Sequence, residues 1–388
     1  MKLFNIFLTA ALSVFSTQAI AQNECTVNGR LKNVEDGAEI LLMQEMGRVG
    51  MSIASDTVRD GRFSIKWPAG DGTEKFSLYS SSDGFPGMSL NIWAKAGSVI
   101  EVSGNDKYIY TWGVKNDVPE QAEWARLLNP NRENWIEYQR LSAERKDLFR
   151  KMDGLANNER GKIRAAIDSV DKLSDLIMQV IYKKEMELLE KGKMTDIGME
   201  RLQRIALHVN YPGGDSMRPQ AEVLYNKLSD GQKKSIEGKT IYINLYPPKV
   251  VQTGNSMADG NLNDLDGKGY NLSDFNGKFI LLDFWSMGCG PCIMAMPEMR
   301  ELAEKYETRL AIVSLTCDND KAWRTASASY DITWYNLSDG MEFSGIAAQY
   351  GVNAIPHYTL ISPEGIIIDS WTGYGKNNLK NRMKKYIK

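Results

Sequence analysis

Two cysteines separated by two residues are the part of this chain best suited to chemistry. Cys289 and Cys292 enclose Gly290 and Pro291, directly after an apolar run over residues 279–285 and directly before a helical pattern. At a helix start, backbone N–H groups and the positive end of the helix dipole favour a thiolate and lower the cysteine pKa. The second cysteine, one turn further on, can then attack a mixed disulfide formed by the first. The spacing therefore predicts thiol–disulfide exchange.

Length and composition are those of an ordinary globular protein. The 388 residues exceed the usual size of one domain, so two or three domains are expected. Hydrophobic residues make up 43%, charged residues 25%, and the formal net charge is -2, which gives no electrostatic argument for binding nucleic acid. Four cysteines in a chain of this length do not predict a disulfide framework.

Residues 1–21 have the pattern of a cleaved signal peptide. Lys2 precedes an apolar run over residues 3–15, and a segment of polar and small residues ends at Ala21. The apolar run is too short and wrongly flanked for a spanning helix, although a retained anchor is the alternative. We therefore expect an exported, periplasmic protein.

The chain up to residue 256 predicts a β-rich module, a helical segment and a linker. Residues 22–110 alternate short apolar segments with turn residues such as Asp60-Gly61, which fits an antiparallel sandwich of about seven strands. Residues 119–240 carry apolar stripes at helical spacing, which predicts a hairpin or small bundle packed between domains. The alternative is a partner-binding or dimerisation face, which would leave a stripe exposed. Residues 241–256 have the pattern of an extended linker.

Residues 257–388 alternate strand and helix patterns. The expected strands cover residues 279–285, 310–316, 333–337, 357–361 and 366–371, and the expected helices follow Cys292 and cover residues 320–329, 343–350 and 377–388. Alternation that ends in a hairpin predicts an α/β sheet with one antiparallel edge.

Four features in order make this last third resemble the thioredoxin superfamily. They are Asp283-Phe284-Trp285, Cys289-Gly290-Pro291-Cys292, Pro297 in the following helix, and Ala354-Ile355-Pro356 before the hairpin. With the signal pattern and the approach over residues 264–278, the chain resembles the exported TlpA/ResA branch of thiol–disulfide oxidoreductases. The β-rich module resembles, over residues 58–63 and 100–106, a small β domain of unknown function that precedes such domains in some secreted bacterial proteins.

The resemblance implies roles for individual residues. Cys289 would be the attacking thiolate and Cys292 the resolving cysteine, and Asp283 would accept the proton of Cys292. A structurally satisfied aspartate at a strand end is the alternative for Asp283. Trp285, Gly290 and Pro291 would support the dithiol, Pro356 would be the cis-proline, and the backbone of Ile355 would pair with an extended substrate chain.

Three positions depart from the thioredoxin pattern. Gly288 stands where tryptophan is usual, which widens access to Cys289. His357 stands where threonine is common, and it would either tune the thiolate or face solvent at the strand start. Ser314 falls near the position of the lysine that partners the buried acid in thioredoxin.

The remaining ionisable and thiol groups predict no metal site. His208 has no second histidine or cysteine nearby to complete a ligand set. Cys25 and Cys317 are left over, and they would bridge, stay free or join the redox chemistry. No cofactor is expected.

The resemblance implies an exported enzyme that reduces protein disulfides and is re-reduced by a membrane electron donor. Gly-Pro between the cysteines resembles the reducing members of the family, whose reduction potentials are about -270 mV. A thiol peroxidase is one alternative, although residues 286–288 lack the proline such sites carry before the cysteine. A non-enzymatic binding or assembly protein on a thioredoxin-like scaffold is the other, and the helical segment would suit a homo-oligomer.

Overall fold

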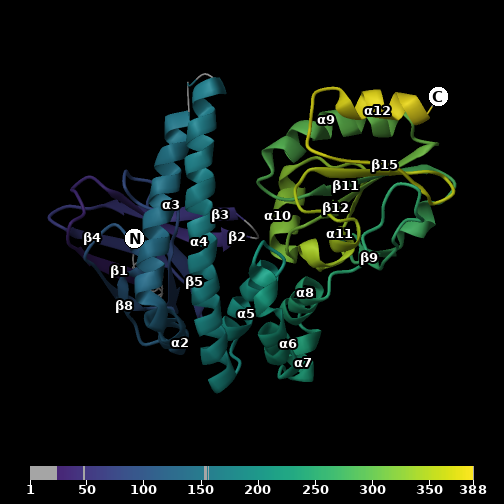
Figure 1. Ribbon diagram of the computed structural model, residues 1–388. Helices are drawn as coiled ribbons and strands as arrows, with labels where there is room; N and C mark the ends of the chain where they lie inside the picture. The colour runs from purple at the N-terminus through teal and green to yellow at the C-terminus, as the bar shows by residue number, and fades with distance from the viewer. Residues whose placement is uncertain (1–23, 47–48, 153–154, 156, 388) are drawn as a thin grey trace, which may run out of the picture. The chain divides into compact units, whose positions relative to one another are not determined.

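The structure is a computed structural model that describes residues 24–387, apart from residues 47–48, 153–154 and 156 (Figure 1). The predicted signal peptide over residues 1–21 lies outside the described residues. Apart from residues 46–49, the described chain up to Gly198 forms one compact unit and the chain from Met199 forms a second.

Strands of the first unit form two four-stranded sheets, in the orders β4-β1-β7-β8 and β3-β2-β5-β6. Their bounds are β1 (Glu24–Leu31), β2 (Glu39–Met46), β3 (Val49–Thr57), β4 (Arg62–Pro68), β5 (Glu74–Tyr79), β6 (Leu90–Ala94), β7 (Val99–Gly104) and β8 (Gly113–Lys115). Alternate side chains of both sheets enter one apolar core, as the sandwich prediction requires.

Two details of this sandwich can be compared with the sequence. Asp60 and Gly61 form the predicted tight turn, with φ values of 50° and 64°. The prediction of a purely antiparallel sandwich is wrong, because β1 and β7 pair in parallel. Strands of the other sheet come between β1 and β7 in the sequence. The connection is therefore long enough for β7 to pair with β1 in parallel, which a tight hairpin does not allow.

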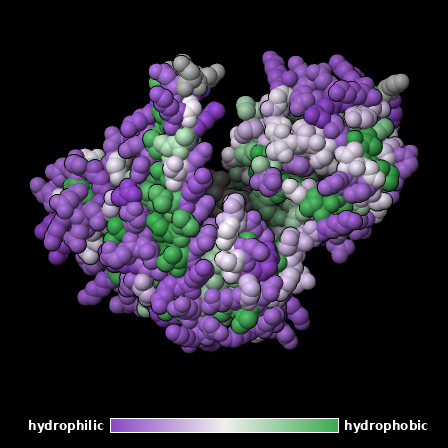
Figure 2. Space-filling model, in the orientation of Figure 1, coloured by the Kyte–Doolittle hydropathy of each residue, from purple (hydrophilic) through white to green (hydrophobic). Residues whose placement is uncertain are grey.

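Long helices complete the first unit. They are α2 (Pro119–Leu128), α3 (Arg132–Met152) and α4 (Asn157–Lys191), with short 3-10 turns η1 (Ile109–Thr111) and η2 (Asn129–Asn131). On α4, the apolar residues that recur at helical spacing are only partly buried. Ile167 and Ile181 are buried, whereas Leu173 and Val180 are 51% and 53% exposed. Figure 2 shows hydrophobic surface gathered over α3 and α4.

Shorter helices follow at the start of the second unit. They are α5 (Asp196–His208), which begins just before it, η3 (Gly214–Met217), α6 (Arg218–Asn226), α7 (Asp230–Lys234) and α8 (Ile236–Leu245). Because α8 reaches Leu245, the first residues of the predicted linker are helical. None of the helices in the described ranges carries an apolar stretch long enough to cross a membrane.

The last part of the chain is a five-stranded sheet in the order β13-β12-β11-β14-β15. The elements are β9 (Leu262–Asn263), β10 (Gly269–Tyr270), η4 (Leu272–Phe275), β11 (Phe279–Trp285), α9 (Gly290–Lys305), β12 (Leu310–Thr316), α10 (Asp320–Ser329), β13 (Tyr335–Leu337), η5 (Glu342–Ser344), α11 (Ile346–Gln349), β14 (His357–Ile361), β15 (Ile367–Thr372) and α12 (Asn378–Tyr386). Central strand β11 runs parallel to β12 and antiparallel to β14. Helices α9 and α12 cover one face and α11 the other (Figure 1). The predicted thioredoxin-like fold is confirmed.

Candidate active site

A disulfide joins Cys289 and Cys292 at the amino end of α9. Cys289 is the residue that caps the helix, and its Sγ lies 3.3 Å from the backbone N of Cys292, which donates to it. Cys289 is partly exposed, whereas Cys292 is 1% exposed. Gly290 and Pro291 between them are exposed at the first turn of the helix. Cys289 is therefore the more exposed of the two cysteines.

The loop ahead of the disulfide is held by a residue that sequence reasoning missed. Asp318 is 1% exposed, and its Oδ2 accepts the backbone N–H of Met287 at 2.5 Å. Gly288 follows with a φ of 76°, a conformation that glycine adopts at little cost. The sequence could have indicated Asp318 through its position shortly after β12. The carboxyl ends of parallel strands lie at one edge of a sheet, so a residue that follows β12 lies near the residues that follow β11.

Asp283 lies inside the domain on the same side of the sheet as the buried cysteine. Along β11, the side chains of Leu281 and Trp285 enter the core that also contains Cys292, and Asp283 lies between them in the period-two alternation. Trp285 is fully buried in this core. The strand pattern therefore brings Asp283 and Trp285 to the α9 face, as the predicted site requires.

The carboxyl group of Asp283 has one hydrogen bond from a side chain. Oδ2 accepts the hydroxyl of Ser314 at 2.8 Å, while Oδ1 is buried with no hydrogen-bond partner among the described residues. Burial raises the pKa of Asp283 to about 7, and the bond from Ser314 opposes this rise. A carboxyl group with such a pKa can exchange a proton near neutral pH.

The segment before β14 carries the predicted cis-proline. The peptide bond between Ile355 and Pro356 is cis, and Pro356 is buried. Ile355 is partly exposed, and it packs against the same core as Cys289. Ile355 and Cys289 are thus both partly buried residues at the edge of one core.

His357 does not face solvent, so that alternative is wrong. It is 8% exposed, its Nδ1 lies 2.9 Å from Thr372 Oγ1, and its Nε2 lies 3.1 Å from Ser370 Oγ. Burial lowers the pKa of His357, which is therefore neutral at pH 7. Its ring contacts that of Phe284, which faces the α11 side of the sheet and not the side of Asp283.

The other two cysteines, Cys25 and Cys317, are buried thiols. The Cys25 thiol donates to the carbonyl of Lys95 at 3.1 Å, and burial raises its pKa. Cys317 lies in the core of the α11 face. Within the described residues, no group of three or more His, Cys, Asp or Glu side chains is placed to hold a metal ion.

Comparisons with known proteins agree with this geometry. The Redoxin family model matches residues 252–386. The thioredoxin-like protein YneN of Bacillus subtilis is 33% identical over 32% of this chain and 73% of its own length. The thiol-disulfide oxidoreductase ResA of Bacillus cereus is 31% identical over 39% of this chain and 86% of its own length.

Solved structures of proteins with similar names also resemble part of the chain. The thioredoxin domain of a thiol-disulfide oxidoreductase from Bacteroides vulgatus is 25% identical, with a TM-score of 0.33, and covers 36% of this chain and 99% of its own. The sequence relatives carry the conclusion, because this chain spans more than two thirds of each at over 30% identity. Through its C-terminal third, the chain belongs to the thioredoxin-like thiol–disulfide oxidoreductases.

Proposed function

We propose that the chain is exported and reduces disulfides of client proteins by dithiol exchange through Cys289 and Cys292. One observation carries this proposal. The accessible sulfur of Cys289 caps a helix, while its partner Cys292 is buried on the face that holds a carboxyl group with a pKa of about 7. The proposed order of attack follows from this difference in access.

The reaction takes two exchange steps. The Cys289 thiolate attacks a client disulfide, forms a mixed disulfide and releases one client thiolate, which takes a proton from solvent. Cys292 then gives its proton to Asp283 and attacks Cys289 Sγ, which forms the internal disulfide and releases the second client thiolate. This thiolate takes up the proton that Asp283 gives back. The client gains two electrons and two protons, and the dithiol is oxidised. An external dithiol donor, proposed to lie in the membrane, must return these electrons.

Export and the domain limits are part of the same proposal. Export is inferred from the pattern of residues 1–21 and would give the protein a periplasmic location. The thioredoxin-like domain is proposed to cover residues 257–388, with the β-rich module over residues 22–110 and the helical segment over residues 119–240. The backbone of Ile355, a partly exposed residue, is the proposed contact for the client chain.

Trapping tests the chemistry. The Cys292→Ser variant, expressed with its export signal, should accumulate mixed disulfides between Cys289 and its clients. The Cys289→Ser variant is the matched control and should accumulate none. Purified reduced protein should reduce insulin, and both variants should lose this activity by at least about 100-fold. Retained insulin reduction in Cys289→Ser would overturn the proposal. Retained peroxide turnover without insulin reduction would instead indicate a thiol peroxidase.

A second proposal concerns α4. We propose that its exposed side chains Leu173, Leu176 and Val180, which are 51%, 58% and 53% exposed, form a face for self-association. Light scattering should give a dimer mass for the parent and a monomer mass for the Leu173→Glu, Val180→Glu double variant. Lys172→Glu, an exposed polar change on the same helix, is the control. Equal masses for parent and double variant would contradict this role.

A further inference from the structure

We propose that Ser314 and Trp334 are positioning residues for Asp283. They direct one hydroxyl proton onto its carboxylate and so set the pH at which Cys292 can lose its proton. This inference rests on the proposed role of Asp283 as the proton acceptor in dithiol exchange. It assigns a function to the uncharged residue that stands near the position of the thioredoxin lysine.

The three side chains form a short hydrogen-bonded chain. Ser314 on β12 lies directly opposite Asp283 on β11 in the parallel pair. Its hydroxyl donates to Asp283 Oδ2 at 2.8 Å, and Trp334 Nε1 donates to the same hydroxyl oxygen at 2.8 Å. Ser314 is 1% exposed, so water does not replace these contacts freely.

The donor and acceptor groups of these three side chains determine the direction of their hydrogen bonds. An indole N–H can only donate, whereas a hydroxyl has one proton and two lone pairs. Because Trp334 occupies a lone pair of Ser314, the hydroxyl proton is left to point toward Asp283. A hydrogen bond to the carboxylate favours its charged form and opposes the effect of burial.

Other groups around Asp283 leave Ser314 as its hydrogen-bond donor. Tyr358 lies opposite Asp283 on β14, and burial raises its pKa, so it stays neutral. Glu298 on α9 is buried, but its two oxygens accept the backbone N–H groups of Asn377 at 3.1 Å and Lys380 at 2.6 Å. Cys292 of α9 lies in this core, and it is the proposed proton donor.

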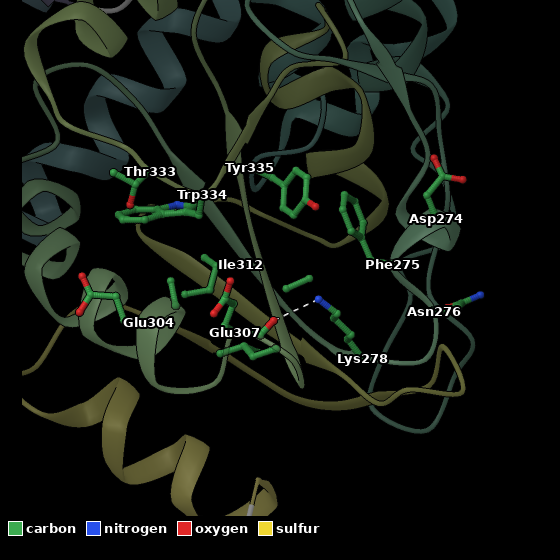
Figure 3. A pocket seen from close by; sticks show the side chains of 13 residues that line it. Asp274, Phe275, Asn276, Lys278, Glu304, Glu307, Ile312, Thr333, Trp334 and Tyr335 are labelled. Carbon is green, nitrogen blue, oxygen red and sulfur yellow. Dashed lines mark hydrogen bonds between the residues drawn. The ribbon is translucent and has the colours of Figure 1, made fainter.

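Trp334 also reaches the surface of the domain. Figure 3 shows its ring at the wall of a cavity of about 650 Å³, with Phe275 and Tyr335 nearby. The same residue is partly exposed there while its N–H is directed to Ser314. Trp334→Phe therefore keeps an aromatic ring at this wall and removes the N–H donor, at the cost of a smaller side chain.

The test follows the second exchange step as a function of pH. Reduced protein is converted to a mixed disulfide of Cys289 with thionitrobenzoate, and release of this chromophore by Cys292 is recorded by stopped flow from pH 5 to 9. The parent should show a midpoint near the pKa of about 7 of Asp283. Ser314→Ala should move the midpoint to higher pH by about one unit, and Trp334→Phe by a smaller amount in the same direction.

Two control variants separate positioning from general damage. Ser314→Thr keeps a hydroxyl and should restore the parent midpoint. Trp323→Phe removes another buried indole donor of the same core, whose N–H binds Asn336 Oδ1 at 2.9 Å, and should leave the midpoint unchanged. If Ser314→Ala does not fold, Trp334→Phe alone decides between the outcomes.

The outcomes distinguish this inference from the proposed function. An unchanged midpoint in Ser314→Ala and Trp334→Phe, together with loss of the titration in Asp283→Asn, would overturn the positioning role and leave the proton acceptor in place. A parent midpoint that survives in Asp283→Asn would show that Asp283 is not the acceptor. Release in the Cys292→Ser variant at the parent rate would contradict dithiol exchange itself.

Discussion

The two faces of the five-stranded sheet differ in whether certain buried polar groups have hydrogen-bond partners. On the α11 face, His357 has a hydroxyl within hydrogen-bonding distance of each ring nitrogen, and the Tyr350 hydroxyl donates to the carbonyl of Ala258 at 2.9 Å. On the α9 face, Asp283 Oδ1 and the Tyr358 hydroxyl are buried with no hydrogen-bond partner among the described residues.

This difference separates structural from chemical polar groups. An unpaired buried polar atom costs roughly 1–3 kcal/mol, so it persists where it has a use. The unpaired oxygen of Asp283 lies on the face whose core contains Cys292, whereas the paired His357 and Tyr350 lie on the other face. If the proposed proton transfer is correct, the unpaired carboxyl oxygen on the α9 face lowers stability in exchange for that function, and the following substitutions test this comparison.

The largest expected effect is that of Asp283→Asn on stability. Burial raises the pKa of Asp283 in the folded state to about 7, whereas its pKa in the unfolded chain is about 3.9. Its contribution to stability is therefore present below pH 4 and lost as the pH rises through 7. Asp283→Asn should raise the free energy of unfolding by up to about 4 kcal/mol at pH 9 and by little at pH 4. Urea unfolding at both pH values measures this, and an equal effect at the two values would contradict it.

Glu298→Ala should act in the opposite direction. This buried carboxylate accepts two backbone N–H groups at the start of α12, which otherwise lack partners. Its loss should lower the free energy of unfolding by about 1–3 kcal/mol.

The control for this change is Glu301→Ala. The Glu301 carboxylate is 63% exposed and pairs with the ammonium group of Lys380, so its removal should change stability by less than about 1 kcal/mol. Equal losses in both variants would show that the cap formed by buried Glu298 contributes no more to stability than an exposed ion pair.

The smallest expected effect is that of His357→Gln. This residue lies on the other face, so the midpoint of the thionitrobenzoate release should not move. Because burial lowers the pKa of His357, its contribution to stability is present above pH 6.5 and is lost as the pH falls through the folded-state value. His357→Gln should flatten this acid loss of stability in unfolding curves from pH 5 to 7. A shifted release midpoint would place His357 in the redox chemistry.

Several features follow from the sequence because they depend on neighbouring residues. The period-two and period-3.6 patterns predict the bounds of β11, β12, α10 and β14. The turn at Asp60-Gly61 follows from residues that tolerate positive φ. Cys289 and Cys292 at a helix start, with Asp283 in the preceding strand, are also readable from local order alone.

Other features were decided by the tertiary structure, because they join residues distant in the chain. The parallel pairing of β1 with β7, the cap that Glu298 gives to α12, and the contact of Asp318 with Met287 all depend on how separate elements pack. The sequence places Asp283 before the cysteines, but only strand pairing puts Ser314 opposite it and His357 on the other face. The local order of residues thus determined the dithiol itself, whereas strand register determined which groups surround Asp283, the proposed proton acceptor.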